Sequence, residues 1–213
     1  MRNPKGRGQS GTRKRRPVVY IICEGRETEK NYFSQFRTRH SLIEIKPLAS
    51  KHTAAKMLVS GAGDLIRFDP YYPEDGDQIW CVFDRDSNSN EDLHEAEKIA
   101  AESGYMIAFS NPCFELWYLL HFTEQRAYLQ DADAVIGKLD TDGRLKRYAK
   151  SKAYYDMLRP LQPDAVKRAQ ALIEKLRETG QPLLHRDSNP HTSVVSLVLY
   201  LEERKKLHGP TDE

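Results

Sequence analysis

The first half of the chain alternates short apolar runs with amphipathic stretches. Strands are expected at 18–23, 43–49, 79–83 and 105–109. Helices are expected between them, at 27–39, 53–67 and 91–103. The runs at 18–23 and 79–83 are continuously apolar, which is typical of strands covered on both faces. This order of elements predicts an α/β fold with a mostly parallel four-stranded sheet flanked by helices.

The second half has a mainly helical pattern. Helices are expected at about 114–122, 131–139, 150–158, 164–179 and 191–207. Asn111-Pro112 precedes the first of them and Asn189-Pro190 precedes the last, and such a pair suits the cap and first turn of a helix. The expected division of the chain is a disordered basic arm at 1–16, an α/β core at 17–110, a helical part packed on that core at 111–207, and a tail at 208–213.

Composition places the chain among globular proteins. Its 213 residues, 39% of them hydrophobic, are enough for one main domain with an addition and a real core. No run of about 18 apolar residues is present, so a soluble protein located in the cytoplasm is expected. The three cysteines are widely spaced in apolar segments, which indicates burial rather than disulfides or a zinc site.

The net charge of +2 hides a strong asymmetry. Residues 1–16 contain seven Lys or Arg and no acid, whereas the remaining residues carry 26 basic and 31 acidic side chains. A segment of this composition is typical of a disordered arm. The arm could contact the phosphates of a nucleic acid, or it could be a solubilising tail.

Carboxylates follow two of the expected strands directly. Glu24 comes after the first strand, and Asp84 and Asp86 come after the third. Because the carboxyl ends of parallel strands share one edge of a sheet, all three are expected at that edge. Two aspartates one residue apart suit Mg²⁺ or Mn²⁺, and Glu24 could be a general acid or base or a further ligand. The alternative is that Asp86 and its Ser and Asn neighbours merely cap the following helix.

Glu115 is unusual because it lies in an otherwise apolar helix, where an unpaired charge is costly to bury. It could lie at the strand-end site, contributing to a metal site or positioning a base. Alternatively, it could form a structural ion pair with an Arg or Lys, or interact with the helix N-terminus.

Basic residues interleaved with tyrosines mark a further candidate region. They are Arg144, Lys146, Arg147, Lys150 and Lys152, with Tyr148, Tyr154 and Tyr155. This composition suits phosphate neutralisation and base stacking, although it also fits a solvated helix face. Arg85, between the two aspartates, is another candidate for contact with nucleic acid. The residues around the second Asn-Pro pair either form a loop and cap or reach the site; they are His185, Arg186, Asp187, His191 and Thr192.

Four motifs in a fixed order resemble the RloB-like family. They are Ile22-Cys23-Glu24-Gly25 with Thr28-Glu29, Val82-Phe83-Asp84-Arg85-Asp86, the run from Ser110 to Phe122, and Asn189-Pro190-His191-Thr192. The resemblance extends from about Val18 to Leu201 and omits the basic arm. It implies a TOPRIM-type fold, shared with topoisomerases, primases and overcoming-lysogenization-defect nucleases.

The resemblance also implies roles for individual residues. Glu24 would be the catalytic acid or base, Asp84 and Asp86 would bind Mg²⁺, and Glu115 would be a site residue of undetermined role. The supporting residues would be Gly25, Asn111, Pro112, His191 and Thr192. The family is associated with bacterial defence against phage by abortive infection, often beside an ATPase. No ATP-binding motif is present in this sequence, so an ATPase would be a separate partner.

These observations favour a Mg²⁺-dependent nuclease that hydrolyses DNA or RNA. The alternative is a module that binds metal and nucleic acid without turnover and regulates a defence ATPase. Strand transfer or nucleotidyl transfer on the same fold is a third hypothesis, although the sequence shows no clear nucleophilic tyrosine.

Overall fold

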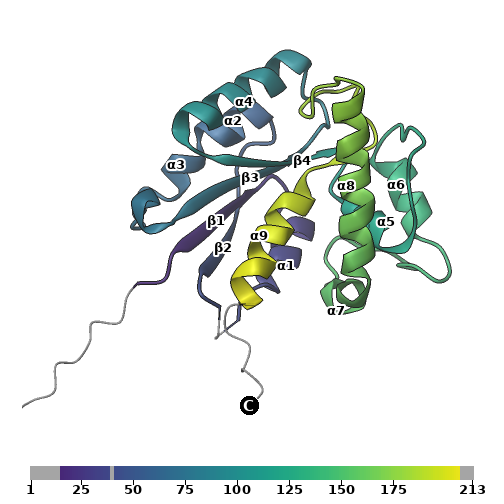
Figure 1. The fold of residues 1–213 in the computed structure, drawn as a ribbon, viewed down its shortest axis with the longest axis horizontal. Helices are drawn as coiled ribbons and strands as arrows, with labels where there is room; N and C mark the ends of the chain where they lie inside the picture. Colours follow the sequence, from purple (N-terminus) through teal and green to yellow (C-terminus); the bar gives the residue numbers. More distant parts are fainter. Residues whose placement is uncertain (1–14, 39–40, 207–213) are drawn as a thin grey trace, which may run out of the picture.

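The computed structural model describes residues 15–38 and 41–206. Its centre is a five-stranded sheet of order β2-β1-β3-β4-β5. The four parallel strands are β1 (Val18–Cys23), β2 (Glu44–Ala49), β3 (Gln78–Asp84) and β4 (Met106–Asn111). Helices flank the sheet (Figure 1), which confirms the α/β class and the four predicted strands. The prediction of a four-stranded sheet missed one strand, because a fifth strand pairs antiparallel to β4.

The fifth strand, β5 (His191–Thr192), lies where the sequence predicted the start of the last helix. Thr192 pairs with Ser110 of β4, and their hydroxyl oxygens are 3.1 Å apart. The prediction of a helix from 191 was therefore wrong at its start, and helix α9 spans Val194–Lys206. One sheet edge is β2, which contains Pro47. The other is the very short β5 together with the part of β4 before Ser110, which has no strand partner on that side among the described residues.

Side chains of β1 alternate between two hydrophobic clusters, one on each face of the sheet. Val19 and Ile21 belong to the cluster that includes residues of α1 (Thr28–Ser34), α5 (Glu115–Phe122), α8 (Gln162–Glu178) and α9. Tyr20 and Ile22 belong to the cluster built with α2 (Ala55–Ser60) and α4 (Asn90–Ser103). Figure 1 shows α2 and α4 on one side of the sheet and α1 and α9 on the other. Burial on both faces explains why the sequence of β1 is continuously apolar.

Several helices differ from their predicted bounds. The helix expected at 53–67 is divided at Gly61 into α2 and the short α3 (Ala62–Leu65). The helix expected at 150–158 is reduced to α7 (Tyr155–Leu158), which leads through a 3₁₀ turn (Arg159–Leu161) into α8. The loop before α7 is fixed by side chains instead: Tyr154 accepts a hydrogen bond from the backbone N–H of Ala149 (2.8 Å) and stacks on Tyr148. Helix α6 (Ala132–Leu139) and a 3₁₀ turn at Pro73–Asp75 complete the elements.

The remaining expectations concern burial and the chain ends. All three cysteines are buried and free, as predicted. No helix within residues 15–38 and 41–206 is long and apolar enough to cross a membrane. Arg15, near the end of the predicted arm, forms an ion pair with Asp77, just before β3. Most of that arm and the predicted tail at 208–213 lie outside the described residues. The division at 110/111 stays a prediction.

Candidate active site

The ends of β1 and β3 bring Glu24 and Asp84 together. The backbone N–H of Glu24 continues the ladder to the carbonyl of Val82 (2.9 Å). In return, the Glu24 side-chain Oε2 accepts a hydrogen bond from the backbone N–H of Asp84 (3.0 Å). The parallel pairing therefore places both residues at one edge of the sheet, as their positions after the two strands predicted.

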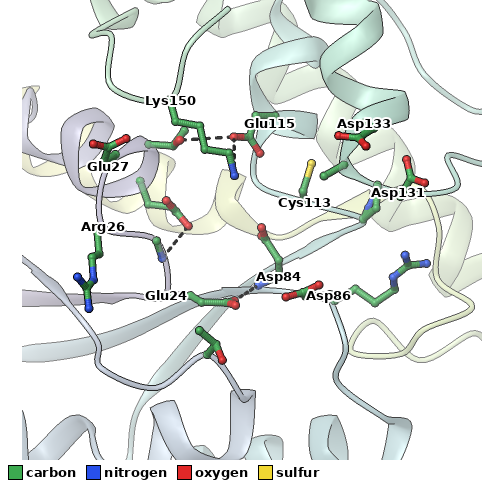
Figure 2. Close-up of a pocket in the computed structure, with 17 residues that line it drawn as sticks. Glu24, Arg26, Glu27, Asp84, Asp86, Cys113, Glu115, Asp131, Asp133 and Lys150 are labelled. Carbon is green, nitrogen blue, oxygen red and sulfur yellow. Dashed lines mark hydrogen bonds and ion pairs between the residues drawn. The ribbon is translucent and has the colours of Figure 1, made fainter.

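A cavity of about 640 Å³ opens at this edge and contains most of the candidate residues. Its walls come from the ends of three strands, from the start of α1 and from the segments around α5 and α6 (Figure 2). The charged lining residues are Glu24, Arg26, Glu27, Glu29, Asp84, Arg85, Asp86, Glu115, Asp131, Asp133 and Lys150. Seven of these eight acidic side chains and Lys150 are labelled in the figure, and the lining is strongly acidic.

Asp84 is the least satisfied carboxylate of the cavity. Its Oδ1 is buried and has no hydrogen-bond partner among the described residues. Burial, and then the negative charges of Glu29, Glu24 and Glu115, raise the pKa of Asp84 well above its usual range. The ionised form is therefore costly in the metal-free protein, because nothing of opposite charge compensates it directly.

Glu24 is half-buried beside Asp84. Burial raises its pKa to about 7, although the hydrogen bond from the Asp84 backbone N–H lowers it. A carboxyl group with this pKa exchanges a proton near neutral pH, which is what a general acid or base requires.

Glu29 is a site residue that sequence reasoning did not single out, although it belongs to the motif at Thr28-Glu29. Glu29 is only 5% exposed, and its Oε1 accepts a hydrogen bond from the backbone N–H of Gly25 (3.1 Å). A Cβ atom on Gly25 would lie 2.0 Å from the Glu29 Oε2. Glycine at position 25 thus allows a buried carboxylate to approach the backbone, which gives Gly25 a supporting place in the site.

Glu115 is 2% exposed and is held by three neighbouring groups. Its Oε1 accepts hydrogen bonds from the hydroxyls of Tyr148 (2.7 Å) and Thr28 (3.4 Å), and it lies 3.9 Å from the Lys150 Nζ. The negative charge of Glu115 raises the pKa of Lys150. Glu115 therefore lies at the strand-end cavity and also pairs with a lysine. A contribution of Glu115 to a metal site or to a base stays a prediction.

Asp86 is exposed in the turn after β3 and lines the cavity. It does not cap α4, because Ser89 is the N-cap and forms a capping box with Asp92. The alternative is therefore wrong for Asp86 itself, whereas its neighbour Ser89 does cap the helix.

The predicted basic region reaches the cavity at one residue, Lys150. Arg144, Lys146, Arg147 and Lys152 do not line it; Lys146 pairs instead with Asp142 at 2.5 Å. Tyr154 and Tyr155 are buried in the core, so the expectation that they stack on bases is wrong. Arg85 lines the cavity and donates a hydrogen bond to the Gln130 carbonyl (3.0 Å). Sequence reasoning missed Arg26, Asp131 and Asp133, which lie in loops or at a helix start without a motif.

Most of the residues predicted around the two Asn-Pro pairs lie outside the cavity. Asn111 does not cap α5, which begins at Glu115 with Phe114 at its N-cap. Its side-chain Nδ2 donates instead to the carbonyls of His185 (3.2 Å) and Arg186 (2.8 Å). Pro112 lines the cavity, whereas Asn111, His191 and Thr192 do not.

His191 is buried beside Asn111 in the sheet, and burial lowers its pKa to about 4. Asn111, His191 and Thr192 therefore adjoin the site through the pairing of β4 with β5.

The donor chemistry of the cavity suits a hard divalent cation. Asp84, with an unpartnered oxygen, and Asp86 are the carboxylates best placed to hold one, with Glu24 beside them. Within residues 15–38 and 41–206, no three His, Cys, Asp or Glu side chains are already arranged as a complete metal site. Mg²⁺ does not require such a cage, since it is commonly bound by one or two carboxylates together with water and substrate phosphate.

Comparison with known proteins identifies the family. Searches of curated proteins and of solved structures found no match. The model of the family described as RloB-like protein matches residues 19–201, which include every strand except the first residue of β1. This match covers most of the chain, and the chain belongs to the RloB-like protein family.

Proposed function

We propose that this protein is a Mg²⁺-dependent nuclease that hydrolyses phosphodiester bonds in DNA or RNA. The observation that carries the proposal is the buried, unpartnered Oδ1 of Asp84 in an acidic cavity at the strand ends. A protein gains no stability from carboxylates placed together in this way. A divalent cation between Asp84 and Asp86 would offset the cost, and Mn²⁺ could replace Mg²⁺.

The arrangement of the sheet supports a TOPRIM-type fold as part of this proposal. Glu24 follows β1, and Asp84 and Asp86 follow the adjacent parallel strand β3, as the family resemblance implies. The antiparallel β5 makes the sheet mixed and adds to the four-stranded arrangement that was expected.

Each part of the reaction has a residue suited to it. The bound cation would polarise the scissile phosphate. Glu24, with a pKa of about 7, would accept or release the proton that hydrolysis moves. Lys150 and Arg85, which line the same cavity, would neutralise phosphates of the nucleic acid. The other predicted phosphate contacts would lie outside the cavity.

A second candidate is a module that binds metal and nucleic acid without turnover and regulates a defence ATPase. The absence of a complete set of metal ligands among the described residues favours this candidate. A regulatory site does not need a metal and a general base aligned on a scissile bond. In either case, the family resemblance supports a cytoplasmic protein of bacterial phage defence with a separate ATPase as partner.

The test is cleavage of phage DNA, transfer RNA and single-stranded oligonucleotides by the full-length protein in Mg²⁺, Mn²⁺ or EDTA. Glu24→Gln and Asp84→Asn should abolish cleavage, whereas Asp142→Asn, on the exposed surface, should not. Cleavage that persists in EDTA or in both site variants would refute the mechanism. Mn²⁺ and nucleic-acid binding without products, also after addition of the ATPase, would favour the regulatory module.

A further inference from the structure

The turn that carries Asp86 is held by a segment one hundred residues later in the sequence. The Arg186 guanidinium Nη1 donates hydrogen bonds to two carbonyls of this turn, those of Asp86 (3.2 Å) and Asn88. Arg186 does not line the cavity. It therefore contacts the backbone of a candidate ligand from behind, while the Asp86 side chain faces the cavity (Figure 2).

Asp86 needs such support because its backbone is strained. Its φ is +29°, a value that residues other than glycine seldom adopt. Conformations of this kind persist only where the surrounding structure fixes them. The Asp86 carbonyl is one of the two groups that Arg186 binds, so the contact acts directly on the strained residue.

Arg186 is itself held in place through both of its backbone polar groups, the N–H and the carbonyl. Its backbone N–H donates to the Asn90 Oδ1 (2.9 Å), at the start of α4, and its carbonyl accepts from the Asn111 Nδ2 (2.8 Å). Asn111 also accepts a hydrogen bond from the Asn189 Nδ2 (3.0 Å). Both Asn-Pro asparagines thus belong to one network, and that network ends on the Asp86 turn.

We propose that Arg186 is a positioning residue for the metal site. It holds the main chain at 86–88 so that the Asp86 carboxylate remains directed toward the ion that Asp84 also binds. The inference rests on the proposed function, since it assigns the support of the same site. It gives the segment around the second Asn-Pro pair a role in metal binding without making it a ligand.

The test measures binding of Mn²⁺ alone by isothermal titration calorimetry. Arg186→Met should raise the dissociation constant by about 10- to 100-fold, the usual effect of losing a residue that orients a metal ligand. Arg186→Lys, which offers one compact donor group in place of the planar guanidinium, should fall between the wild type and Arg186→Met.

Arg168→Met is the matched control. Arg168 also donates from one Nη1 to two backbone carbonyls, those of Leu120 (2.7 Å) and His121 (3.0 Å), but at the end of α5. The Arg168→Met variant should therefore lose about as much folding stability as Arg186→Met and keep the Mn²⁺ affinity of the wild type. Amide hydrogen exchange in metal-free protein should be faster at 85–89 in Arg186→Met and unchanged there in Arg168→Met.

The outcomes separate this inference from the function on which it rests. Wild-type Mn²⁺ affinity in Arg186→Met or, if that variant does not fold, in Arg186→Lys would overturn the positioning role. Loss of affinity in Asp84→Asn would in that case still support the metal site. Equal losses of Mn²⁺ affinity in Arg186→Met and Arg168→Met would show that the effect is general destabilisation, and would also overturn the positioning role. No Mn²⁺ binding by the wild type would overturn the metal-dependent function and this inference together.

Discussion

Replacing Asp84 by asparagine should make the metal-free protein more stable while it removes the proposed metal site. The Asp84 carboxylate is surrounded by Glu24, Glu29 and Glu115, and its Oδ1 has no partner among the described residues. Asparagine has nearly the same shape and no charge. Its introduction therefore relieves electrostatic repulsion without opening a cavity.

The size of the gain follows from the proton balance of Asp84. An aspartate with an unfolded-state pKa of about 3.9 costs about 4 kcal/mol to keep protonated at pH 7, which sets the ceiling on the penalty. We expect about 1–3 kcal/mol of it to be recovered, because the asparagine amide is also short of partners. For a chain of this size, that gain corresponds to a rise in Tm of roughly 3–10 °C.

The sign of the pH dependence provides a second check. Because the folded-state pKa of Asp84 is raised, its penalty is absent at low pH and grows as the pH rises above the unfolded-state value. At pH 5 the ceiling is only about 1.5 kcal/mol. The stability difference between Asp84→Asn and the wild type should therefore be larger at pH 7 than at pH 5.

The assay is urea or thermal unfolding in EDTA and again in excess Mg²⁺. We expect Asp84→Asn to unfold at higher temperature than the wild type in EDTA, and Mg²⁺ to stabilise the wild type alone. An Asp84→Asn protein that is less stable in EDTA and gains as much from Mg²⁺ as the wild type would refute the reasoning.

Three further predictions concern other residues. Gly25→Ala should destabilise the protein by about 1–3 kcal/mol in urea unfolding, because its Cβ would meet Glu29, whereas Gly137→Ala, in open space on α6, should be neutral or stabilising. Burial lowers the pKa of His121 to about 4, so the folded protein resists its protonation and stability is lost as the pH falls through 6.5 toward 4. His121→Leu should lessen the fall in unfolding free energy between pH 7.5 and pH 5 by about 2 kcal/mol; an unchanged fall would contradict this. Lys150→Met should weaken nucleic-acid binding and reduce the slope of log affinity against log salt by about one, and an unchanged slope would exclude a phosphate contact.

The four parallel strands and the shared edge of Glu24 and Asp84 were predictable because they depend on local sequence and on parallel pairing. A run such as Val18–Cys23 has few alternatives to a strand covered on both faces. Two such strands in parallel necessarily bring the residues that follow them to one edge. The sequence alone could thus place these two carboxylates at one edge. Their contact could not be predicted, because it requires β1 and β3 to be neighbours in the sheet.

The rest depends on contacts between distant segments. The strand His191–Thr192 is too short to have a periodic pattern, and the helical pattern after it extended the predicted helix over it. In the sequence, Glu29 resembles any polar residue at the start of a helix. Only the folded structure brings it close to Glu115 and Asp84. Asn111 looked like a cap because the residues that bind its side chain lie more than seventy positions away.

The two borders of the sheet have a consequence for how this protein could assemble. An open strand edge invites pairing with another chain unless it is short or interrupted. On one border, β2 contains Pro47, which offers no backbone donor, and β5 on the other border is only two residues long. Beside β5, the part of β4 before Ser110 is also short, and the N–H and carbonyl of Phe109 are bonded to Ser193. Neither border of the described sheet thus offers a long run of free backbone groups to another strand. We therefore expect copies of this protein, or a partner, to meet through helices and loops, and its sheet to resist growth into fibrils.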